Sequence, residues 1–246
     1  MKKFLTMLKI ESRIALRGID GVFFGVAMPV GVALLIGMIA GNKPAFAGAE
    51  YTFLESTFPA LVTVAICTTA FMGIPLGLSD YRDKKILKHY FVTPVRPSML
   101  LLVQVAINLI IALVSGALVC LVMKLFLGYR MNGSKLEFFL YYMLVLVSMY
   151  ALGMVMASLC RTVKSTNLVC TLVYFPMVFL SGATVPFEIL PEGLQKAASV
   201  LPLTQGIRLL KAAAMNQEIN RVIPIVILLA IALVGAVVSV KTFRWE

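Results

Sequence analysis

Six apolar runs, none of which contains Asp, Glu, Lys or Arg, constrain this chain more than any other feature of its sequence. They cover residues 22–40, 56–78, 98–123, 138–160, 165–183 and 222–240. Apolar runs of about 20 residues are candidates for transmembrane helices. Charged residues make up only 13% of the chain, against roughly 25% in soluble domains. The sequence therefore predicts an all-α polytopic membrane protein with six transmembrane helices, forming a single domain over residues 1–246.

The distribution of basic residues predicts the orientation of the chain. Fourteen of the 22 Lys and Arg residues lie in residues 1–21, 79–97, 161–164 and 241–246, which share one side of the membrane. Loops on the cytoplasmic side are normally the richer in Lys and Arg. We therefore expect both termini in the cytoplasm of a multi-pass plasma-membrane protein. The net charge of +11 is then a property of the membrane surface, where anionic lipid is the expected partner and nucleic acid is not.

Residues 1–21 have the pattern of an amphipathic helix that lies in the membrane interface. Apolar side chains fall on one arc and basic side chains on the neighbouring arc. The apolar set is Phe4, Leu5, Leu8, Ala15, Leu16 and Ile19, and the basic set is Lys2, Lys9, Arg13 and Arg17. The segment is either a simple basic anchor before the first span or a connecting helix that transmits motion.

Motifs for catalysis and metal binding are missing from the sequence. No Gly-Lys dipeptide is present, so the chain lacks a phosphate-binding loop of the G-x-x-x-x-G-K-[ST] type. The four cysteines lie within apolar runs without metal-ligand spacing, and the single histidine has no partner. Ion-coupled transporters generally carry ionisable residues inside the membrane, and these spans have none. We expect no catalytic residue, cofactor or metal in this chain, and any energy for transport to come from a cytoplasmic partner.

Residues 175–214 interrupt the membrane pattern. The fifth run breaks at Ser181-Gly182, and three prolines then separate short amphipathic segments that are too polar to cross a bilayer. The pattern predicts an extracellular re-entrant helical elbow over residues 184–214. Its second helical segment carries Arg208 and Lys211, which would be costly in hydrocarbon, so we expect that segment to lie at the headgroups.

The connector at residues 79–97 is highly charged up to Lys88 and apolar thereafter. Asp80 is suited to capping a short helix of about ten residues, and Pro94 and Pro97 to ending it. On composition alone, a solvated loop and a helical knob that docks into the groove of a partner are equally well supported.

Two ordered series of residues resemble those of type-2 ABC exporter permeases. Residues Arg82-Asp83, Leu87 and 91–97 (FVTPVRP) are similar to the family pattern E-R-E-x-G-T-L-x-x-L-x-V-T-P-V. Tyr81 stands in place of the first acid, Asp83 in place of the second, and Lys85 where the family often has glycine. The second series comprises Pro176, Ser181-Gly182, Pro186, Leu190-Pro191 and Leu201-Pro202-Leu203-Thr204. Together with the six runs, the resemblance covers essentially the whole chain.

The resemblance implies a permease that dimerises with the same or a homologous permease chain and pairs with two ATP-binding cassette subunits, which would hold ATP and Mg. Residues 79–97 would be the coupling segment. The residues implied in coupling are Tyr81, Arg82, Asp83, Lys85, Leu87, Tyr90, Thr93, Pro94, Arg13 and Arg17. Those implied in an outer gate are Ser181, Gly182, Pro186, Pro191, Leu201 and Pro202.

A pathway between two such chains would be lined by the second and fifth spans. The candidate residues are Thr68, Thr69, Met72, Thr171, Tyr174, Phe175, Met177 and Phe179, each of which would otherwise serve helix packing. This uncharged, methionine- and aromatic-containing wall suits an amphiphilic cargo such as a lipid, a drug or a peptide. Two alternatives stay open: an ion-coupled secondary transporter, and a non-transporting membrane immunity or scaffold protein.

Overall fold

The computed structural model describes residues 2–17, 23–40, 43–45, 51–86, 97–160, 162–184, 187 and 190–242. Within these residues every regular element is a helix, and an isolated antiparallel bridge pairs Pro44 with Thr52. The prediction of an all-α polytopic membrane protein is confirmed.

Five helices are long and apolar enough to cross a membrane. They are Phe53–Asp83, Met99–Leu127 within α7 (Pro97–Leu127), α8 (Lys135–Leu159), α9 (Val163–Leu180) and α12 (Val222–Thr242). The expected first span corresponds to the π-helix η1 (Phe23–Ala27) followed by α3 (Met28–Ala40). Its apolar helix, Gly25–Ile39, is shorter than the other five. A helix of this length rises only about 22 Å at 1.5 Å per residue.

The second expected span forms the centre of the bundle. It consists of α4 (Phe53–Thr68), the π-helix η2 (Thr69–Gly73) and α5 (Ile74–Asp83) in one continuous helix. Thr52 and Glu55 cap its start reciprocally, since the Thr52 hydroxyl accepts from the Glu55 amide while the Glu55 carboxylate accepts from the Thr52 amide. Every residue from Ser56 to Phe71 is buried, because the other helices surround this one.

The surrounding helices pack closely where side chains are small. The helices α8 and α12 lie side by side, and a Cβ at Gly235 would meet the Ala151 side chain at 3.0 Å. The Ser148 hydroxyl on α8 donates to the Leu228 carbonyl of α12 over 2.8 Å. Close approach of this kind, with hydroxyl groups bonding across helices, is typical of membrane bundles.

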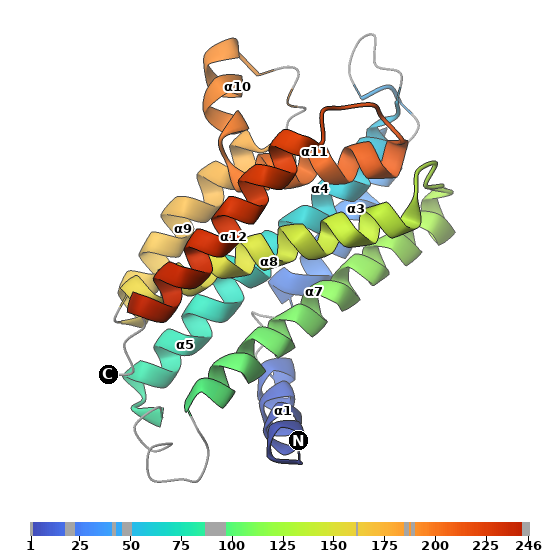
Figure 1. The fold of residues 1–246 in the computed structure, drawn as a ribbon. Coiled ribbons are helices and arrows are strands. Elements are labelled where there is room, and N and C mark those ends of the chain that lie inside the picture. Colours follow the sequence, from blue (N-terminus) through green and yellow to red (C-terminus); the bar gives the residue numbers. More distant parts are fainter. Residues whose placement is uncertain are drawn as a thin grey trace.

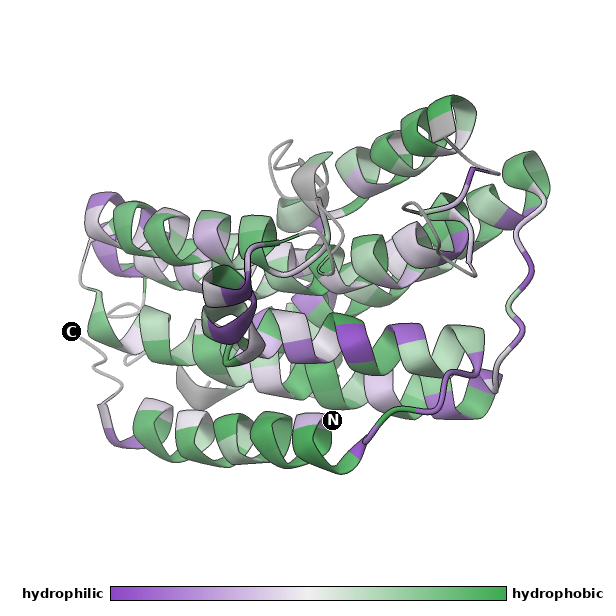
Figure 2. Cartoon of the chain, turned by 90° about the horizontal axis from the view of Figure 1, so that it is seen from above, coloured by the Kyte–Doolittle hydropathy of each residue, from purple (hydrophilic) through white to green (hydrophobic). Residues whose placement is uncertain are grey.

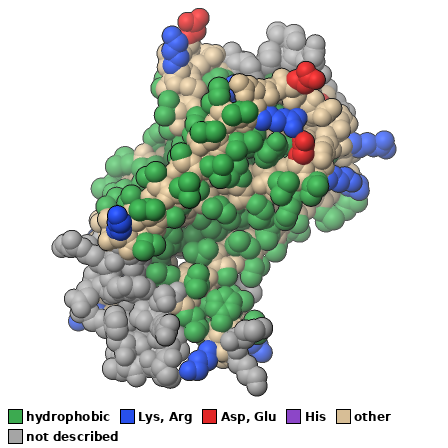
Figure 3. Space-filling view, in the orientation of Figure 1, with side chains coloured by type: hydrophobic (Ala, Val, Ile, Leu, Met, Phe, Trp, Pro, Cys, Tyr) green, Lys and Arg blue, Asp and Glu red, His purple; other side chains and the backbone are tan. Residues whose placement is uncertain are grey.

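Charged and apolar side chains are separated on the surface in the way a membrane requires. In Figure 3 apolar side chains cover the middle of the visible face, while Lys, Arg, Asp and Glu gather toward its two ends. Seen from above in Figure 2, the long helices are mostly hydrophobic and the hydrophilic residues concentrate near their ends and in the connections. The exposed leucine and valine side chains on α7, α9 and α12 are therefore available for contact with lipid or with another membrane chain.

The helix ends divide into two groups at opposite ends of the bundle (Figure 1). One group holds α1 (Lys2–Arg17), the end of α5, the start of α7, the turn between α8 and α9, and the end of α12. The other holds the connection from α7 to α8 together with α10 (Glu192–Ser199) and α11 (Pro202–Met215). This is the alternating grouping that the sequence predicts.

Two local expectations differ from the structure. The central helix continues to Asp83, so Asp80 lies inside α5 instead of capping a new helix, and Pro97 begins α7 instead of ending a helix. Pro97 suits that place because the first helical position needs no amide donor. The helix α11 packs on α4 and α8, and eleven of its 14 residues are buried in the protein, Lys211 included. Its depth in the membrane stays a prediction.

Candidate functional site

Side chains at the end of α5 bind two other helices. The Arg82 guanidinium donates from Nη1 to the Ala157 carbonyl at 2.6 Å and to the Cys160 carbonyl at 2.8 Å. These carbonyls belong to the last turn of α8, where backbone acceptors lack partners within the helix and a cation is favoured. Arg82 therefore closes the C-terminus of α8.

The neighbouring Asp83 binds the helix that follows. Its Oδ2 atom accepts a hydrogen bond from the backbone amide of Val163, the first residue of α9, at 3.0 Å. The same helix start is capped reciprocally by Thr162 and Ser165. An acceptor with a negative charge is favoured at a helix N-terminus. Consecutive residues of α5 thus hold both sides of the α8–α9 turn.

A third side chain of the same helix end contacts the N-terminal helix. Tyr81 donates from its hydroxyl to the Glu11 carboxylate, and the amide of Gln104 donates to Glu11 at 3.3 Å and to the Tyr81 hydroxyl at 3.2 Å. This polar cluster joins α1, α5 and α7. Glu11 is only 5% exposed, so the face that α1 turns toward the bundle contains an acid as well as apolar residues.

Only some of the other residues expected in coupling lie within the described part of the chain. Lys85 has a left-handed backbone (φ 56°) that ends α5, and Lys84 forms an exposed ion pair with Asp80 at 2.8 Å. Arg13 is exposed on α1, and Arg17 lies in its last turn. The four remaining candidates, Leu87, Tyr90, Thr93 and Pro94, fall outside the described residues.

The expected pathway residues gather between the central helix and α9 but divide into two sets. Thr68 and Tyr174 share a buried hydrogen bond of 3.0 Å, and Thr69 accepts from the Tyr150 hydroxyl at 3.1 Å. Met177 is also buried, whereas Met72 and Thr171 are half-buried. Phe175 and Phe179 are 48% and 58% exposed on α9, and their rings stack 6.3 Å apart.

The π-helix η2 lies at the same level and depends on close neighbours. A Cβ at Gly73 would lie 1.9 Å from the Asn108 amide oxygen, and one at Gly153 would lie 2.1 Å from the Ala70 carbonyl oxygen. Gly153 is needed because the atom it would meet belongs to the backbone, whereas the Asn108 side chain beside Gly73 can move away. Single π-turns inside helices are frequent at functional sites.

Most of the expected outer-gate residues form the ends of helices. Ser181 ends α9, and Gly182 follows with a left-handed backbone (φ 85°). Pro191 and Leu201 occupy the N-cap positions of α10 and α11, and Pro202 is the first residue of α11. The elbow therefore consists of two short helices, each started by a proline. Pro186 lies outside the described residues.

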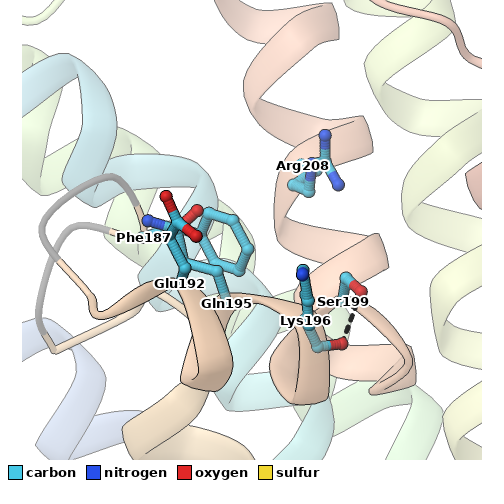
Figure 4. A pocket seen from close by; sticks show the side chains of 6 residues that line it. All are labelled: Phe187, Glu192, Gln195, Lys196, Ser199 and Arg208. Carbon is cyan, nitrogen blue, oxygen red and sulfur yellow. Dashed lines mark hydrogen bonds between the residues drawn. The ribbon is translucent and has the colours of Figure 1, made fainter.

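Two hollows adjoin these helix ends. The larger, of about 380 Å³, lies between α10 and α11 (Figure 4). Its lining is Phe187, Glu192, Gln195, Lys196, Ser199 and Arg208. The second, of about 240 Å³, shares Phe187 and Arg208 with the first and extends to Ser181, Gly182 and Lys211. Arg208 lies over the Phe187 ring, 5.7 Å from its centroid, so a cation–π contact separates the two hollows.

Sequence reasoning missed two buried polar contacts at the α5 end, the Glu11 cluster and a hydrogen bond of 2.5 Å between the Ser79 and Thr166 hydroxyls. A glutamate among apolar residues near the start of the chain was the available signal for the first. No cluster of three His, Cys, Asp or Glu side chains suited to a metal occurs among the residues with assigned positions.

Comparisons with known proteins identify the family of the chain. A model of the ABC-2 type transporter family matches residues 2–215. The chain is 28% identical over 132 residues to an inner membrane transport permease, YhhJ, of Escherichia coli K12, and equally to that of Shigella flexneri. That match covers 53% of this chain and 35% of each permease. The chain is also 39% identical over 72 residues to Nodulation protein J of Rhizobium leguminosarum bv. viciae, covering 29% of this chain and 28% of that protein.

The chain thus spans about a third of the length of the curated relatives that it matches. The family match is far longer and contains both the α5 end and the elbow. This multi-pass membrane protein therefore belongs to the ABC-2 type transporter family, whose members are membrane subunits of transporters.

Proposed function

We propose that this chain is the membrane subunit of an ATP-driven exporter. Two permease chains, identical or homologous, dimerise and pair with two ATP-binding cassette subunits that bind ATP and Mg. The complex moves an amphiphilic substrate, a lipid, a drug or a peptide, out of the cytoplasm or the inner leaflet. The family membership and the similarity to YhhJ, an inner membrane transport permease, support a transport role.

The observation that carries the proposal is the junction at the end of α5. Tyr81 joins α5 to α1 and α7, while Arg82 and Asp83 join it to the α8–α9 turn. The segment that resembles a coupling helix continues directly from this junction. A partner that pushes on the segment would therefore move several helices together instead of bending one loop.

The proposed orientation places the α5 end in the cytoplasm and α10 and α11 outside a bacterial plasma membrane. The excess of basic residues at the α5 end supports this orientation. The exposed Phe175 and Phe179 of α9 would then face the second chain or the substrate, and the buried Thr68–Tyr174 contact would anchor α9 to the central helix.

The test is co-expression with a candidate ATP-binding cassette subunit, followed by affinity purification and reconstitution into vesicles. We expect Arg82→Glu and Asp83→Lys to reduce transport and substrate-stimulated ATP hydrolysis while the protein still inserts into the membrane. Lys241→Glu is the matched control, because Lys241 is exposed in the last turn of α12, at the same end of the bundle but outside the coupling segment.

Other outcomes identify the alternatives. Transport by the reconstituted chain alone, driven by a proton gradient, would establish a secondary transporter. Protection from a toxin without any associated ATPase would establish an immunity or scaffold protein. Normal coupling in both charge-reversal variants would overturn the assignment of the α5 end.

A further inference from the structure

A third hollow, of about 320 Å³, lies away from the coupling junction and the elbow, in the wedge that α7 and α8 form against α4. We call it the α7–α8 pocket. Its lining is Phe58, Val62, Leu113, Gly116, Ala117, Cys120, Met131, Lys135, Phe138, Phe139 and Tyr142. All of these residues are described, and none belongs to the expected pathway.

The walls of the α7–α8 pocket are aliphatic and aromatic with two polar exceptions. The Tyr142 side chain is only 5% exposed, and its hydroxyl has no hydrogen-bond partner among the residues that the structure places. Leaving such a hydroxyl unpaired in an apolar site costs about 1–3 kcal/mol. Gly116 lies beside it without a side chain, and a Cβ built on that glycine would lie 3.6 Å from the hydroxyl, at van der Waals distance.

The second polar group is Lys135, the exposed first residue of α8. It marks the end of the membrane-spanning helix, where a lysine side chain reaches the headgroups. Tyr142 lies seven residues further along α8, about 10 Å deeper at 1.5 Å per residue. The pocket therefore begins at the headgroup level and extends through much of one leaflet, which is about 15 Å thick in hydrocarbon.

The mouth of the α7–α8 pocket opens toward lipid. Ala117 and Phe139 are exposed at its edge, and Leu121 and Leu140 nearby are 53% and 56% exposed. No acidic side chain lines the pocket, and its volume is near the lower end of the 300–1,000 Å³ typical of ligand sites. These features fit a single acyl chain that enters from the bilayer better than a bulky multi-ring compound.

We propose that the α7–α8 pocket binds one acyl chain of an anionic phospholipid. The acyl chain lies against Phe58, Phe138 and Gly116, the Tyr142 ring lines its deeper end, and Lys135 contacts the phosphate. One lysine near the membrane surface favours anionic over zwitterionic lipid by about fivefold. The site is distinct from the export pathway proposed above, and its failure would leave that proposal unchanged.

The test uses a single tryptophan as a reporter of bound lipid. Trp245 is replaced by phenylalanine and the pocket receives Phe139→Trp, while a reference protein carries Leu233→Trp on the exposed face of α12. Each protein is reconstituted in vesicles of phosphatidylcholine with increasing dibrominated phosphatidylglycerol, or with dibrominated phosphatidylcholine. Bromine quenches tryptophan on contact, so the quenching curves give the relative affinity for each lipid.

We expect about a fivefold preference for phosphatidylglycerol at the pocket reporter and none at the reference position. Lys135→Gln should abolish the preference, whereas the matched control Lys124→Gln, on the exposed end of α7, should retain it. Tyr142→Phe should leave the preference unchanged, because Tyr142 lies below the level of the phosphate. Gly116→Leu should fill the pocket and remove the difference between reporter and reference.

Two results would overturn the proposal. If the pocket reporter shows the same quenching curve as the reference, ordinary boundary lipid covers the α7–α8 pocket. If neither brominated lipid quenches the pocket reporter, protein occupies the pocket, and cross-linking through Cys120 between two chains would identify a second copy as the occupant. Normal thermal stability of Gly116→Leu and Lys135→Gln shows that their effects come from the site and not from misfolding.

Discussion

Replacing Arg82 by methionine should release the turn between α8 and α9. The Arg82 side chain supplies two donated hydrogen bonds to the carbonyls of Ala157 and Cys160, and methionine has a similar length but no donor and no charge. The turn would then be held mainly by Asp83 and by the caps of α9. We expect the turn to open far more often while the rest of the bundle stays folded.

The size of the effect follows from the contacts. A hydrogen bond from a charged donor contributes about 1.5–3 kcal/mol. A cation at a partly buried helix C-terminus contributes up to ~2 kcal/mol, which overlaps with that value. Because both bonds come from one half-buried nitrogen and solvent can replace part of them, we take about 3 kcal/mol for the pair. Since 1.4 kcal/mol is a factor of ten, local opening should increase about 100-fold.

The assay is maleimide labelling of Cys160, the residue that directly follows α8 in the turn. Its side chain is only 7% exposed, so labelling reports opening of the turn. Cys67, Cys120 and Cys170 are first replaced by alanine, so that labelling reports only this site. Arg82→Met should label about 100-fold faster than the parent, and Arg82→Lys should give an intermediate rate. Lys84→Met is the control and should label at the parental rate. A rate in Arg82→Met within threefold of the control would refute the account of the turn.

Three further predictions concern other contacts. Glu11→Leu should weaken the docking of α1 by about 2 kcal/mol, seen as faster maleimide labelling of an introduced Met7→Cys. Glu11→Gln should retain most of the contact, and equal labelling in both variants would contradict the role of the carboxylate. Gly153→Ala should destabilise the protein by about 1–3 kcal/mol, because its Cβ would lie 2.1 Å from a backbone oxygen. Gly31→Ala, with open space around the new Cβ, should leave the melting temperature unchanged or higher. Tyr129→Phe should remove part of the loss of stability above pH 10, measured as the melting temperature from pH 8 to 11.

The sign of the Tyr129 prediction follows from linkage. Burial raises the pKa of the Tyr129 phenol above its ordinary value, and nearby Cys120 and Glu55 raise it further. The unfolded chain therefore loses this proton first as the pH passes about 10, while the folded chain keeps it. Stability falls with pH wherever the unfolded state binds fewer protons. An alkaline profile that is identical in Tyr129→Phe would contradict this reasoning.

The sequence predicted the elements that depend on composition along the chain. Five of the expected spans have their counterparts because a long uncharged run has few alternatives to a membrane helix. The two helices of the elbow were foreseen from Pro191 and Pro202, which begin them. These features are local, so no knowledge of distant residues was needed.

The residues that sequence reasoning misplaced depend on partners far along the chain. The charged run from Asp80 to Lys85 has the composition of a solvated loop. In the structure, however, Arg82 and Asp83 form hydrogen bonds with the ends of helices 75 to 80 positions away. By periodicity Glu11 lies between Met7 and Phe4 and away from the basic arc, and its partners Tyr81 and Gln104 follow 70 and 93 positions later. The pattern within α1 shows an acid beside apolar residues but does not show which residues it binds.

The polar contacts also suggest how the two ends of the protein are connected. The helix Phe53–Asp83 has 31 residues and is therefore about 46 Å long at 1.5 Å per residue. At one end its side chains hold α1 and the α8–α9 turn, and at the other it packs against α11, the helix beside both outer hollows. Pro59, which has no amide donor, and the π-turn η2 both interrupt its regular hydrogen bonding, and both are common positions of bends. A force on the α5 end would thus reach the elbow through one buried helix, with Pro59 and η2 as the places where that helix can change its direction.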